Sequence, residues 1–248
     1  MENINNSYFE GYYKDIWKNI VPTELTIRES NFIRDYFRLQ PGSCVLDLMC
    51  GNGRHAIALA KSGMNVTAVD NLKDYIDEVR AIAESENLHI DAVQSDVVEY
   101  EAEGSYDLAL CMGNSLCFFD KVDTTKILRM VGRHLKPDGY MLINSWMLAE
   151  IAFKDFRERS WTTFGDLKFI TDSKYFTKPS RIETDHLILA ADGKTESKKA
   201  IDYIYSINEM EEILNTAGFD LVEIYSIPGK KKFTIGDPRA YIIGKKRC

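Results

Sequence analysis

Apolar residues recur at two different spacings along this chain, and the spacing changes near residue 44. Before that point they recur every three or four positions, as at Tyr12, Ile16 and Ile20, which predicts helices over much of the first forty residues. Pro22 interrupts this helical stretch, and the Pro-Gly pair at 41–42 ends it with a turn. Beyond the turn, short apolar runs alternate with longer amphipathic segments.

The alternation between residues 44 and 145 is typical of a parallel β-sheet. The five apolar runs lie at residues 45–48, 66–69, 90–93, 106–110 and 140–143. Segments with apolar residues at helical spacing separate most of these runs. Strands that alternate with helices of this length predict βαβ units with right-handed crossovers. Ligands of such sheets bind at the carboxyl ends of the strands, so we expect the functional residues there.

The pattern changes again after Trp146, where strand-like segments follow one another without long helices. These segments lie around residues 167–170, 182–189 and 200–206. Asp192-Gly193 supplies a hairpin turn between the last two. A helix and two closing strands follow, at residues 209–216, 219–227 and 239–243. We interpret the strand-like segments as an antiparallel insertion on the main sheet, rather than as an independent second domain.

We therefore predict an α/β fold with a doubly wound, mostly parallel, seven-stranded Rossmann-like sheet and an antiparallel β insertion after its fifth strand. A length of 248 residues is enough for one such domain. The expected parts are an N-terminal helical lid (1–40), a cofactor-binding α/β core (41–147), the insertion on the substrate side (148–206), and a C-terminal helix with closing strands of the core (207–248).

Composition and charge remove several classes of protein. Hydrophobic residues at 45% and charged residues at 28% are ordinary for a globular protein. The apolar runs are shorter than the roughly 20 residues of a membrane helix, and the polar start of the chain is unlike a secretory signal. We therefore expect a cytoplasmic protein without membrane contact. A net charge of −7 disfavours a broad nucleic-acid surface. The five cysteines form no C-x-x-C pair, so we expect reduced thiols.

The sharpest local signal is a glycine loop, Gly51-Asn52-Gly53, between a predicted strand and a predicted helix. Glycines there permit a tight turn and a close approach of a ligand to the backbone, and the helix start offers free N–H groups. The run from Gly51 to Ala56 also fits the dinucleotide fingerprint, with Asp70 about twenty residues further on. The loop alone leaves a nicotinamide dinucleotide as an alternative.

Three acidic residues favour a methyl donor over a dinucleotide. Asp47, Asp70 and Asp96 each lie at or near a strand end, so they line one crevice in the predicted sheet. Asp47 would face a pyrophosphate at a considerable electrostatic cost, whereas it suits a ligand with an ammonium and a sulfonium group. Asp70 can accept hydrogen bonds from ribose hydroxyls, and Asp96 or the amide of Val97 can meet an adenine edge.

In combination, these motifs resemble those of class I S-adenosylmethionine-dependent methyltransferases. Residues 45–55 resemble the first motif of that family, Asp70-Asn71 the second acidic position, Asp96-Val97 the third, and residues 135–139 the turn before the fifth strand. A looser similarity over the whole chain points to the bacterial small-molecule branch that includes aminosugar N-methyltransferases. Those proteins share the Tyr-rich N-terminal helix, the antiparallel insertion and a tail like residues 233–239.

The resemblance implies S-adenosylmethionine as the cofactor and S-adenosylhomocysteine as its product. It implies that Asp47, Gly51 and Gly53 hold the amino-acid end of the donor, Asp70 the ribose, and Asp96 with Val97 the adenine. The full expected cofactor set is Tyr13, Trp17, Asp47, Cys50, Gly51, Gly53, Arg54, His55, Asp70, Asn71, Asp96, Val97 and Met112. The chain departs from its relatives at residues 116–119, where Phe118 replaces a frequent tyrosine.

Methyl transfer from a sulfonium is an in-line displacement, so the protein mainly orients the acceptor, excludes water and sometimes removes a proton. A neutral amine needs little more, and no cluster with metal-ligand spacing stands out, so we expect metal-free methylation, on an amine nitrogen, of a small polar metabolite or natural-product intermediate. The catalytic candidates are Tyr13 and Asn114. The substrate-side candidates are Tyr12, Ser115, Phe118 and Tyr205.

Each of these aromatic and polar residues also has a packing or turn-forming interpretation. Three alternative functions stay open at this point: a methyltransferase that acts on RNA or protein, a nucleotide-dependent oxidoreductase, and a cofactor-binding module without catalysis. The expected partner is a small-molecule acceptor rather than a membrane or a nucleic acid. A homodimer is compatible with the sequence.

Overall fold

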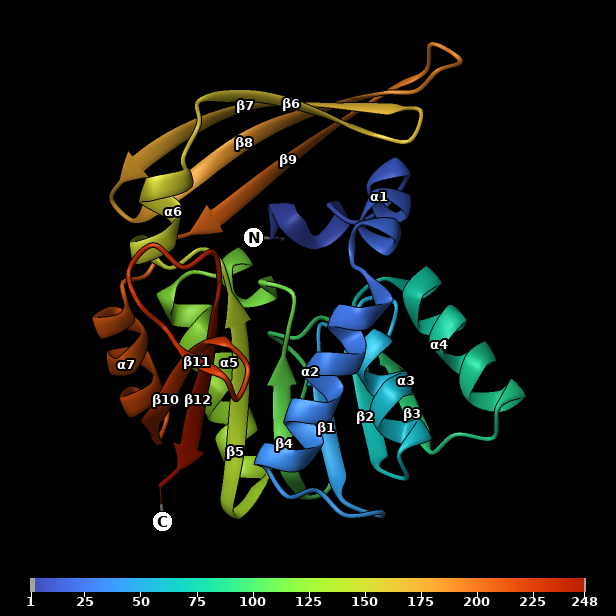
Figure 1. Ribbon diagram of the computed structural model, residues 1–248, viewed down its shortest axis with the longest axis vertical. Helices are drawn as coiled ribbons and strands as arrows, with labels where there is room; N and C mark the ends of the chain where they lie inside the picture. Colours follow the sequence, from blue (N-terminus) through green and yellow to red (C-terminus); the bar gives the residue numbers. More distant parts are fainter. Residues whose placement is uncertain (1–2, 248) are drawn as a thin grey trace.

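The computed structural model describes residues 3–247, so Cys248, one of the five expected thiols, lies outside the described residues. Two sheets lie one above the other, and helices surround the lower one (Figure 1). The helices are η1 (Ile4–Ser7), α1 (Tyr12–Ile20), α2 (Thr23–Tyr36), α3 (Arg54–Lys61), α4 (Lys73–Ser85), η2 (Ser115–Phe118), α5 (Lys121–His134), α6 (Ala149–Asp155) and α7 (Ile207–Thr216).

The lower sheet has eight strands in the order β11-β10-β12-β5-β4-β1-β2-β3. Its strands are β1 (Cys44–Leu48), β2 (Asn65–Asp70), β3 (Ile90–Gln94), β4 (Tyr106–Cys111), β5 (Leu135–Ser145), β10 (Phe219–Ile227), β11 (Lys231–Lys232) and β12 (Ala240–Lys246). Strands β1 to β5 pair in parallel, and β12 and β10 pair antiparallel at one side. The predicted doubly wound sheet is confirmed, and the two-residue strand β11 adds an eighth strand to the seven expected.

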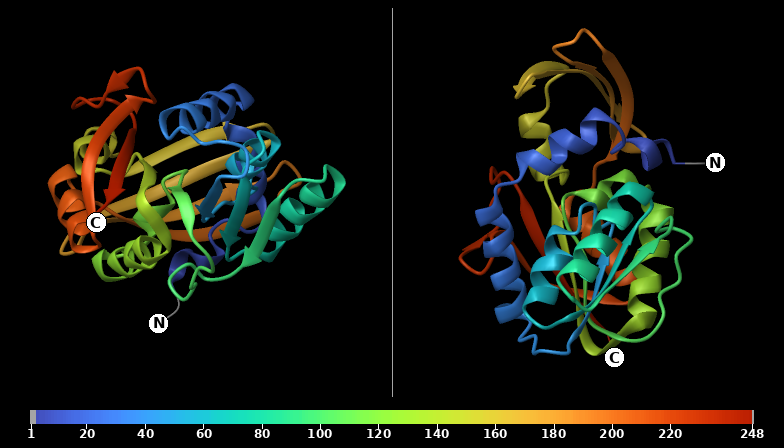
Figure 2. Two further views of the ribbon diagram at one scale, coloured as in Figure 1. Left: turned by 90° about the horizontal axis from the view of Figure 1, so that it is seen from below. Right: turned by 90° about the vertical axis from the view of Figure 1, so that its right-hand side faces the viewer.

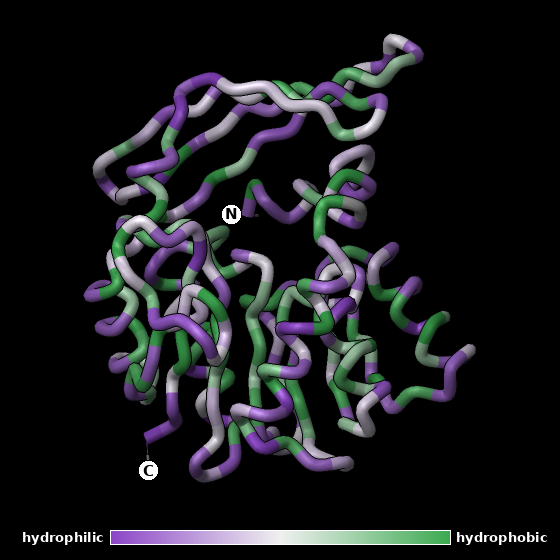
Figure 3. The backbone as a smooth tube through the Cα atoms, viewed as in Figure 1, coloured by the Kyte–Doolittle hydropathy of each residue, from purple (hydrophilic) through white to green (hydrophobic). Residues whose placement is uncertain are grey.

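Strand β1 shows why the predicted strands read as continuous apolar runs. Leu46 and Leu48 face one hydrophobic cluster, which includes residues of α5 and α7, and Val45 faces a second cluster, which includes residues of α2, α3 and α4. Figure 2 shows these two helical layers. Both faces of the sheet are therefore buried, as is usual for parallel sheets. In Figure 3 the central strands are accordingly mostly hydrophobic along their length.

The predicted antiparallel insertion after the fifth strand is confirmed, and it forms a sheet of its own, separate from the main sheet. Its strands are β6 (Arg159–Phe164), β7 (Leu167–Thr177), β8 (Ser180–Leu189) and β9 (Thr195–Tyr203). They pair antiparallel in chain order, and we call this sheet the roof. It lies above the carboxyl ends of the parallel strands (Figure 1). The sequence did not predict β6, because most of its side chains are exposed and no apolar face marks it.

The N-terminal segment, residues 3–20, lies between the roof and the lower sheet (Figures 1 and 2). Asn5 connects both sides, because its side-chain amide donates to the carbonyls of Phe118 and Ile201 at 3.2 and 2.9 Å. At the start of α1, the backbone N–H of Tyr12 donates to the carboxylate of Glu196 in β9 at 3.0 Å. These contacts hold the segment over the strand ends.

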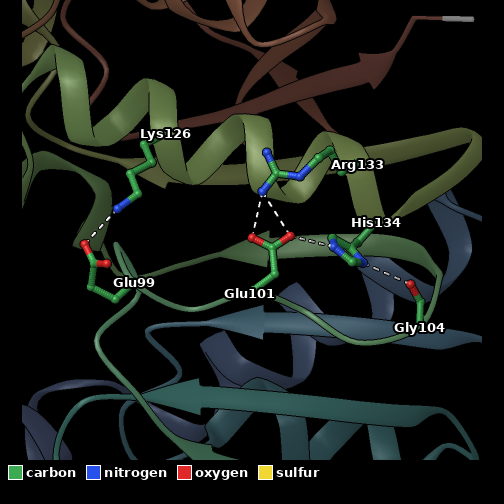
Figure 4. A network of polar contacts seen from close by, with 6 residues as sticks. All are labelled: Glu99, Glu101, Gly104, Lys126, Arg133 and His134. Atoms are coloured by element: carbon green, nitrogen blue, oxygen red, sulfur yellow. Dashed lines mark hydrogen bonds and ion pairs between the residues drawn. The ribbon is translucent and has the colours of Figure 1, made fainter.

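Helix α5 is attached to the loop before β4 by exposed ion pairs (Figure 4). Arg133 and His134 both contact the carboxylate of Glu101, at 2.7 and 3.0 Å, and His134 also contacts the carbonyl of Gly104. Exposed pairs of this kind contribute little to stability. None of the helices within residues 3–247 is long and apolar enough to cross a membrane.

Candidate cofactor and acceptor site

The glycine loop follows β1 and turns sharply into α3. Met49, Gly51 and Gly53 all have positive φ angles, of 53°, 55° and 70°. A Cβ atom on Gly53 would lie 2.6 Å from a methyl carbon of Val79, whereas one on Gly51 would meet nothing within 4 Å. Packing as well as backbone conformation therefore requires glycine at position 53. At position 51 the backbone alone favours it, and the space beside it is free.

Helix α3 begins without a side-chain cap, as α2 and α4 also do. Asp120 and Ser206 cap α5 and α7 through their side chains, but α3 begins at Gly53 without a side-chain cap. The N–H of Ala56 in this first turn donates to the carboxylate of Asp47, which leaves the N–H groups of Arg54 and His55 beside the loop, where they and the helix dipole favour a negatively charged group.

A cavity opens at the carboxyl ends of β1, β2 and β4, next to the point where the strand order reverses between β1 and β4. Eleven of the thirteen expected cofactor residues line it: Trp17, Asp47, Cys50, Gly51, Arg54, His55, Asp70, Asn71, Asp96, Val97 and Met112. Tyr13 and Gly53 are outside this lining. The topology brings most of the predicted set together because these residues lie at or after strand ends that share one edge of the sheet, whereas Trp17 reaches the cavity from α1.

Asp47 forms part of the cavity wall and is almost fully buried, with 1% of its surface exposed. Its Oδ2 atom has no hydrogen-bond partner among the described residues. Burial raises the pKa of Asp47 to about 7, although the charge of Arg54 and the N–H of Ala56 oppose this rise. A buried carboxylate oxygen without a partner is costly, so its position beside a cavity fits the ammonium group of a ligand.

Asp70 also lies on the cavity wall, but backbone groups hold its carboxylate. The N–H of Gly51 donates to one oxygen at 2.8 Å and the N–H of Leu72 donates to the other at 3.0 Å. Burial raises the pKa of Asp70 against these hydrogen bonds. The carboxylate therefore has a fixed direction at the end of β2, and each oxygen keeps a lone pair for a hydroxyl donor.

Asn114, one of the two catalytic candidates, does not line the cavity. It has a φ of 70° and 4% of its surface exposed. Its side-chain oxygen accepts hydrogen bonds from the hydroxyl of Ser145 and the N–H of Trp146, at 3.0 and 2.9 Å, and its amide group contacts the sulfur of Cys117. The side chain thus closes the turn after β4, which was the alternative interpretation of this residue.

Tyr13 also lies away from the cavity lining. Its ring packs against Tyr8 and Phe169, at centroid distances of 4.3 and 5.6 Å, and burial raises its pKa to about 12. The neighbouring Tyr8 hydroxyl contacts Nε2 of His186 in the roof at 3.0 Å. Burial lowers the pKa of His186 to about 4, so this aromatic cluster joins α1 to a neutral histidine of the roof.

Two of the four substrate-side candidates line the cavity and two do not. Ser115 and Phe118 line the cavity, whereas Tyr12 and Tyr205 do not. The hydroxyl of Tyr205 donates to the carbonyl of Phe119 at 3.0 Å and so supports the loop behind the cavity. Tyr205 was also expected as a packing residue, and its contact fits that alternative.

Sequence reasoning missed the polar start of the chain as part of the site. The amide group of Asn6 contacts the carboxylate of Asp96 at 3.4 Å, and the carbonyl of Asn6 accepts from the side chain of Asn71 at 2.7 Å. Further lining residues of this segment are Asn3, Asn5 and Phe9. Because a 3-10 turn of four residues has no hydrophobic periodicity, no pattern in the sequence could have found it.

Glu29 is a second missed residue. It lies on α2, and its buried carboxylate contacts Arg54, His55 and Tyr241. Burial lowers the pKa of His55 against the effect of Glu29. Within residues 3–247, no group of three or more His, Cys, Asp or Glu side chains is arranged to hold a metal ion.

Comparison with known sequences places a methyltransferase domain at residues 45–139. The chain is 35% identical over 107 residues to the ubiquinone biosynthesis O-methyltransferase of Rickettsia akari (strain Hartford). This match covers 41% of this chain and 39% of that protein. The chain thus spans about two fifths of the length of such relatives. A protein of Geobacillus sp. (strain WCH70) described as a methyltransferase is 25% identical over 239 residues, 94% of this chain and 92% of its own.

Solved structures resemble the chain over nearly its whole length. An S-adenosylmethionine-dependent methyltransferase from Clostridium acetobutylicum superposes with a TM-score of 0.82 at 18% identity, covering 96% of this chain and 97% of its own. The sugar N-methyltransferase KedS8 from Streptoalloteichus gives 0.69 at 18% identity, covering 96% and 94%. An amino pentose methyltransferase from Micromonospora echinaspora, solved with S-adenosylmethionine bound, gives 0.71 at 14% identity, covering 96% and 97%.

The chain carries a methyltransferase domain at residues 45–139, and its fold over nearly the whole length is that of S-adenosylmethionine-dependent methyltransferases, with S-adenosylmethionine as the cofactor. It shares this fold with the sugar N-methyltransferase KedS8 and with the amino pentose methyltransferase. Both parts of the predicted resemblance are confirmed.

Proposed function

We propose that the chain transfers a methyl group from S-adenosylmethionine to an amine nitrogen of a small polar metabolite or natural-product intermediate. The observation that carries this proposal is the buried Asp47 carboxylate, which has an oxygen without a partner in the wall of the cavity. A pyrophosphate would be repelled there, whereas the ammonium group of an amino-acid ligand would be attracted.

The remaining lining residues fit the other parts of the cofactor. Asp70 holds the ribose hydroxyls at the end of β2, and Asp96 with the amide of Val97 meets the adenine edge. Arg54 lies beside the uncapped start of α3, and together they hold the carboxylate of the amino-acid end. When bound, the cofactor supplies an activated methyl group, so the residues of the chain have to orient the acceptor and exclude water.

Aromatic side chains support an amine acceptor. Phe9, Trp17 and Phe118 line the cavity on the side of the N-terminal segment, and the rings of Trp17 and Trp146 lie 5.9 Å apart. Aromatic faces attract cationic groups such as a sulfonium or a methylated ammonium. The acceptor then lies between this aromatic wall and the roof, where it is shielded from water.

Oxygen methylation is a second candidate because the Rickettsia relatives are named as O-methyltransferases. Their match to this chain covers 107 residues, 41% of its length. Phe9 and Trp17, which line the cavity from the N-terminal segment, lie outside the methyltransferase domain at residues 45–139. The full-length structural similarity to sugar N-methyltransferases supports nitrogen as the first choice.

Isothermal titration with S-adenosylhomocysteine, run beside NADH, tests the cofactor first. We expect micromolar binding of S-adenosylhomocysteine by the wild-type chain, about tenfold or more weaker binding by Asp47→Ala, and no heat with NADH. Binding of NADH alone would replace the proposal with the oxidoreductase alternative.

Mass spectrometry with deuterated S-adenosylmethionine and mixed acceptor libraries then tests the reaction. We expect products that carry the labelled methyl group on amines. Label on hydroxyl compounds alone would move the proposal to oxygen. Tight cofactor binding without any labelled product would favour a cofactor-binding module. Salt-dependent binding and labelling of tRNA would indicate a macromolecular acceptor.

A further inference from the structure

We propose that Glu29 is a positioning residue for the cofactor: it fixes Arg54 and His55 so that Arg54 receives the carboxylate at the amino-acid end of S-adenosylmethionine. This inference rests on the proposed function. Glu29 lies outside the glycine loop and outside residues 45–139, where the methyltransferase domain matches.

The carboxylate of Glu29 joins three elements of the fold. It lies on α2 with 1% of its surface exposed. Its Oε2 atom accepts from Nη1 of Arg54 at 2.5 Å and contacts Nε2 of His55 at 3.0 Å, both on α3. Its Oε1 atom accepts from the hydroxyl of Tyr241 on β12 at 2.6 Å. Both oxygens are therefore engaged, and the side chain has little freedom to move.

The charge on Glu29 is essential to this arrangement. Burial alone would raise the pKa of Glu29, but His55, Arg54 and Tyr241 together lower it to about 2. The residue is thus ionised at neutral pH. A buried ion pair is costly to break from one side, because the remaining charge loses its partner without gaining water.

Arg54 transmits the effect to the cavity. Its Nη1 atom is held by Glu29 and by the hydroxyl of Thr26, at 2.5 and 3.1 Å, and both of these residues lie on α2. The side chain nevertheless lines the cavity, and its charge lowers the pKa of Asp47 there. A guanidinium has five N–H donors, so one edge can be held while other donors meet a carboxylate. Fixing the guanidinium in advance reduces the entropy lost on binding.

The cavity thus has a pair of opposite charges, Asp47 and Arg54, that match the two charges of an amino-acid group. Without Glu29, two changes follow: the direction of the guanidinium is no longer fixed, and Arg54 can pair with Asp47 directly. Both changes weaken the recognition of the zwitterionic end of the cofactor and leave the adenosine end untouched.

Two ligands separate this positioning role from a purely structural one. S-adenosylhomocysteine carries the amino-acid group, whereas 5′-methylthioadenosine shares its adenosine and thioether but lacks that group. For Glu29→Gln we expect the affinity for S-adenosylhomocysteine to fall about tenfold or more, because a charge-assisted contact is lost, and the affinity for 5′-methylthioadenosine to stay within about twofold. Isothermal titration measures both.

Glu223→Gln is the matched control. Glu223 also accepts from a tyrosine hydroxyl and pairs with a cation, through Tyr36 and Lys232, but it lies away from the cavity. It should bind both ligands like the wild-type chain. In an Arg54→Ala background, Glu29→Gln should cause no further loss of affinity for S-adenosylhomocysteine, because Glu29 acts through Arg54.

Thr26→Ala provides a milder variant if Glu29→Gln does not fold. It removes one of the two contacts that hold Arg54, so we expect about a threefold loss for S-adenosylhomocysteine alone. An equal loss for both ligands, no loss for either, or additive losses in the double variant would overturn the positioning role. Failure of the wild-type chain to bind S-adenosylhomocysteine would instead overturn the proposed function, and this inference with it.

Discussion

Asp47 lies in the wall of the cofactor cavity, and its carboxyl group is almost fully buried. This burial raises its pKa. Because the pKa of about 7 in the folded chain exceeds the ordinary value of 3.8, the folded chain holds the proton more tightly than the unfolded chain. Asp47 alone therefore makes the free protein less stable as the pH rises from about 4 to about 7. A bound ammonium group would remove this cost by pairing with the ionised form.

The affinity for S-adenosylhomocysteine should consequently fall as the pH is lowered through about 7. Below its pKa, Asp47 must release a proton before it can pair with the ligand ammonium. We expect the Kd to rise by up to about tenfold between pH 8 and pH 6. Titrations at the two pH values, each in two buffers of different ionisation enthalpy, should also show proton release at pH 6. Asp47→Asn should bind weakly and equally at both, and an unchanged wild-type Kd would contradict the assignment.

Gly53 should tolerate alanine poorly, and for two reasons that add. Its φ of 70° is strained for other residues by about 1 kcal/mol, and the new Cβ atom would lie 2.6 Å from Val79. We expect Gly53→Ala to lower the free energy of unfolding by about 2–4 kcal/mol in urea titrations. Gly104→Ala is the control, because its φ is 87° but nothing lies within 4 Å of the new atom. Equal losses in both variants would refute the packing argument.

Which site residues the sequence could predict depended on how each one is positioned. Asp47, Asp70 and Asp96 were predictable because strand ends in a parallel sheet meet at one edge. Glu29 was not, because its partner Tyr241 is 212 residues away and only the folded chain brings them together. Asn114 had the right place in the sequence, but nothing there could show that neighbouring polar groups occupy its side chain.

Among the elements, the parallel strands could be predicted from the sequence more fully than the strands of the roof. The parallel strands are buried on both faces, so their apolar runs marked them clearly. The roof strands alternate and are partly exposed, and β6 was missed altogether. The sequence therefore specified an antiparallel insertion but not its separation from the main sheet.

Glu196 is one of several residues that attach the N-terminal segment to the roof, beside the contacts of Asn5 and Tyr8. Its carboxylate accepts from the N–H of Tyr12 at the start of α1, where no other side-chain cap is present in the described chain. Because Phe9 and Trp17 of this segment line the cavity, loosening it should release the cofactor faster. For Glu196→Ala we expect S-adenosylhomocysteine to dissociate about fivefold faster in stopped-flow measurements, since a helix cap contributes about 1 kcal/mol.

Lys199→Ala is the control for that variant. Lys199 also lies on β9, but its side chain is 68% exposed and pairs with Asp185 rather than with α1. It should leave the dissociation rate unchanged. A rate for Glu196→Ala equal to that of Lys199→Ala would show that the segment does not gate the cavity.

For the whole molecule, the two sheets differ greatly in how much core supports them. The main sheet lies between two large hydrophobic clusters, whereas the cluster beneath the roof has three buried members, Ala152, Ile182 and Ile204. A small sheet with so little buried apolar surface depends on the contacts with its neighbours. We therefore expect the roof to open locally while the lower sheet stays folded.

Hydrogen exchange should show that S-adenosylhomocysteine and a methylated amine product protect different segments of the chain. None of the roof residues described in the structure lines the cofactor cavity, whereas several residues between Asn3 and Trp17 and the loops after β1, β2, β3 and β4 do. S-adenosylhomocysteine should therefore slow exchange in those loops and in the N-terminal segment, and leave β6 to β8 nearly unchanged. Addition of a methylated amine product, once found, should slow exchange in the roof as well, because the acceptor is proposed to lie beneath it. If S-adenosylhomocysteine alone protected the roof fully, the two sheets would form one cooperative unit, and the acceptor could no longer be assigned to the roof by protection.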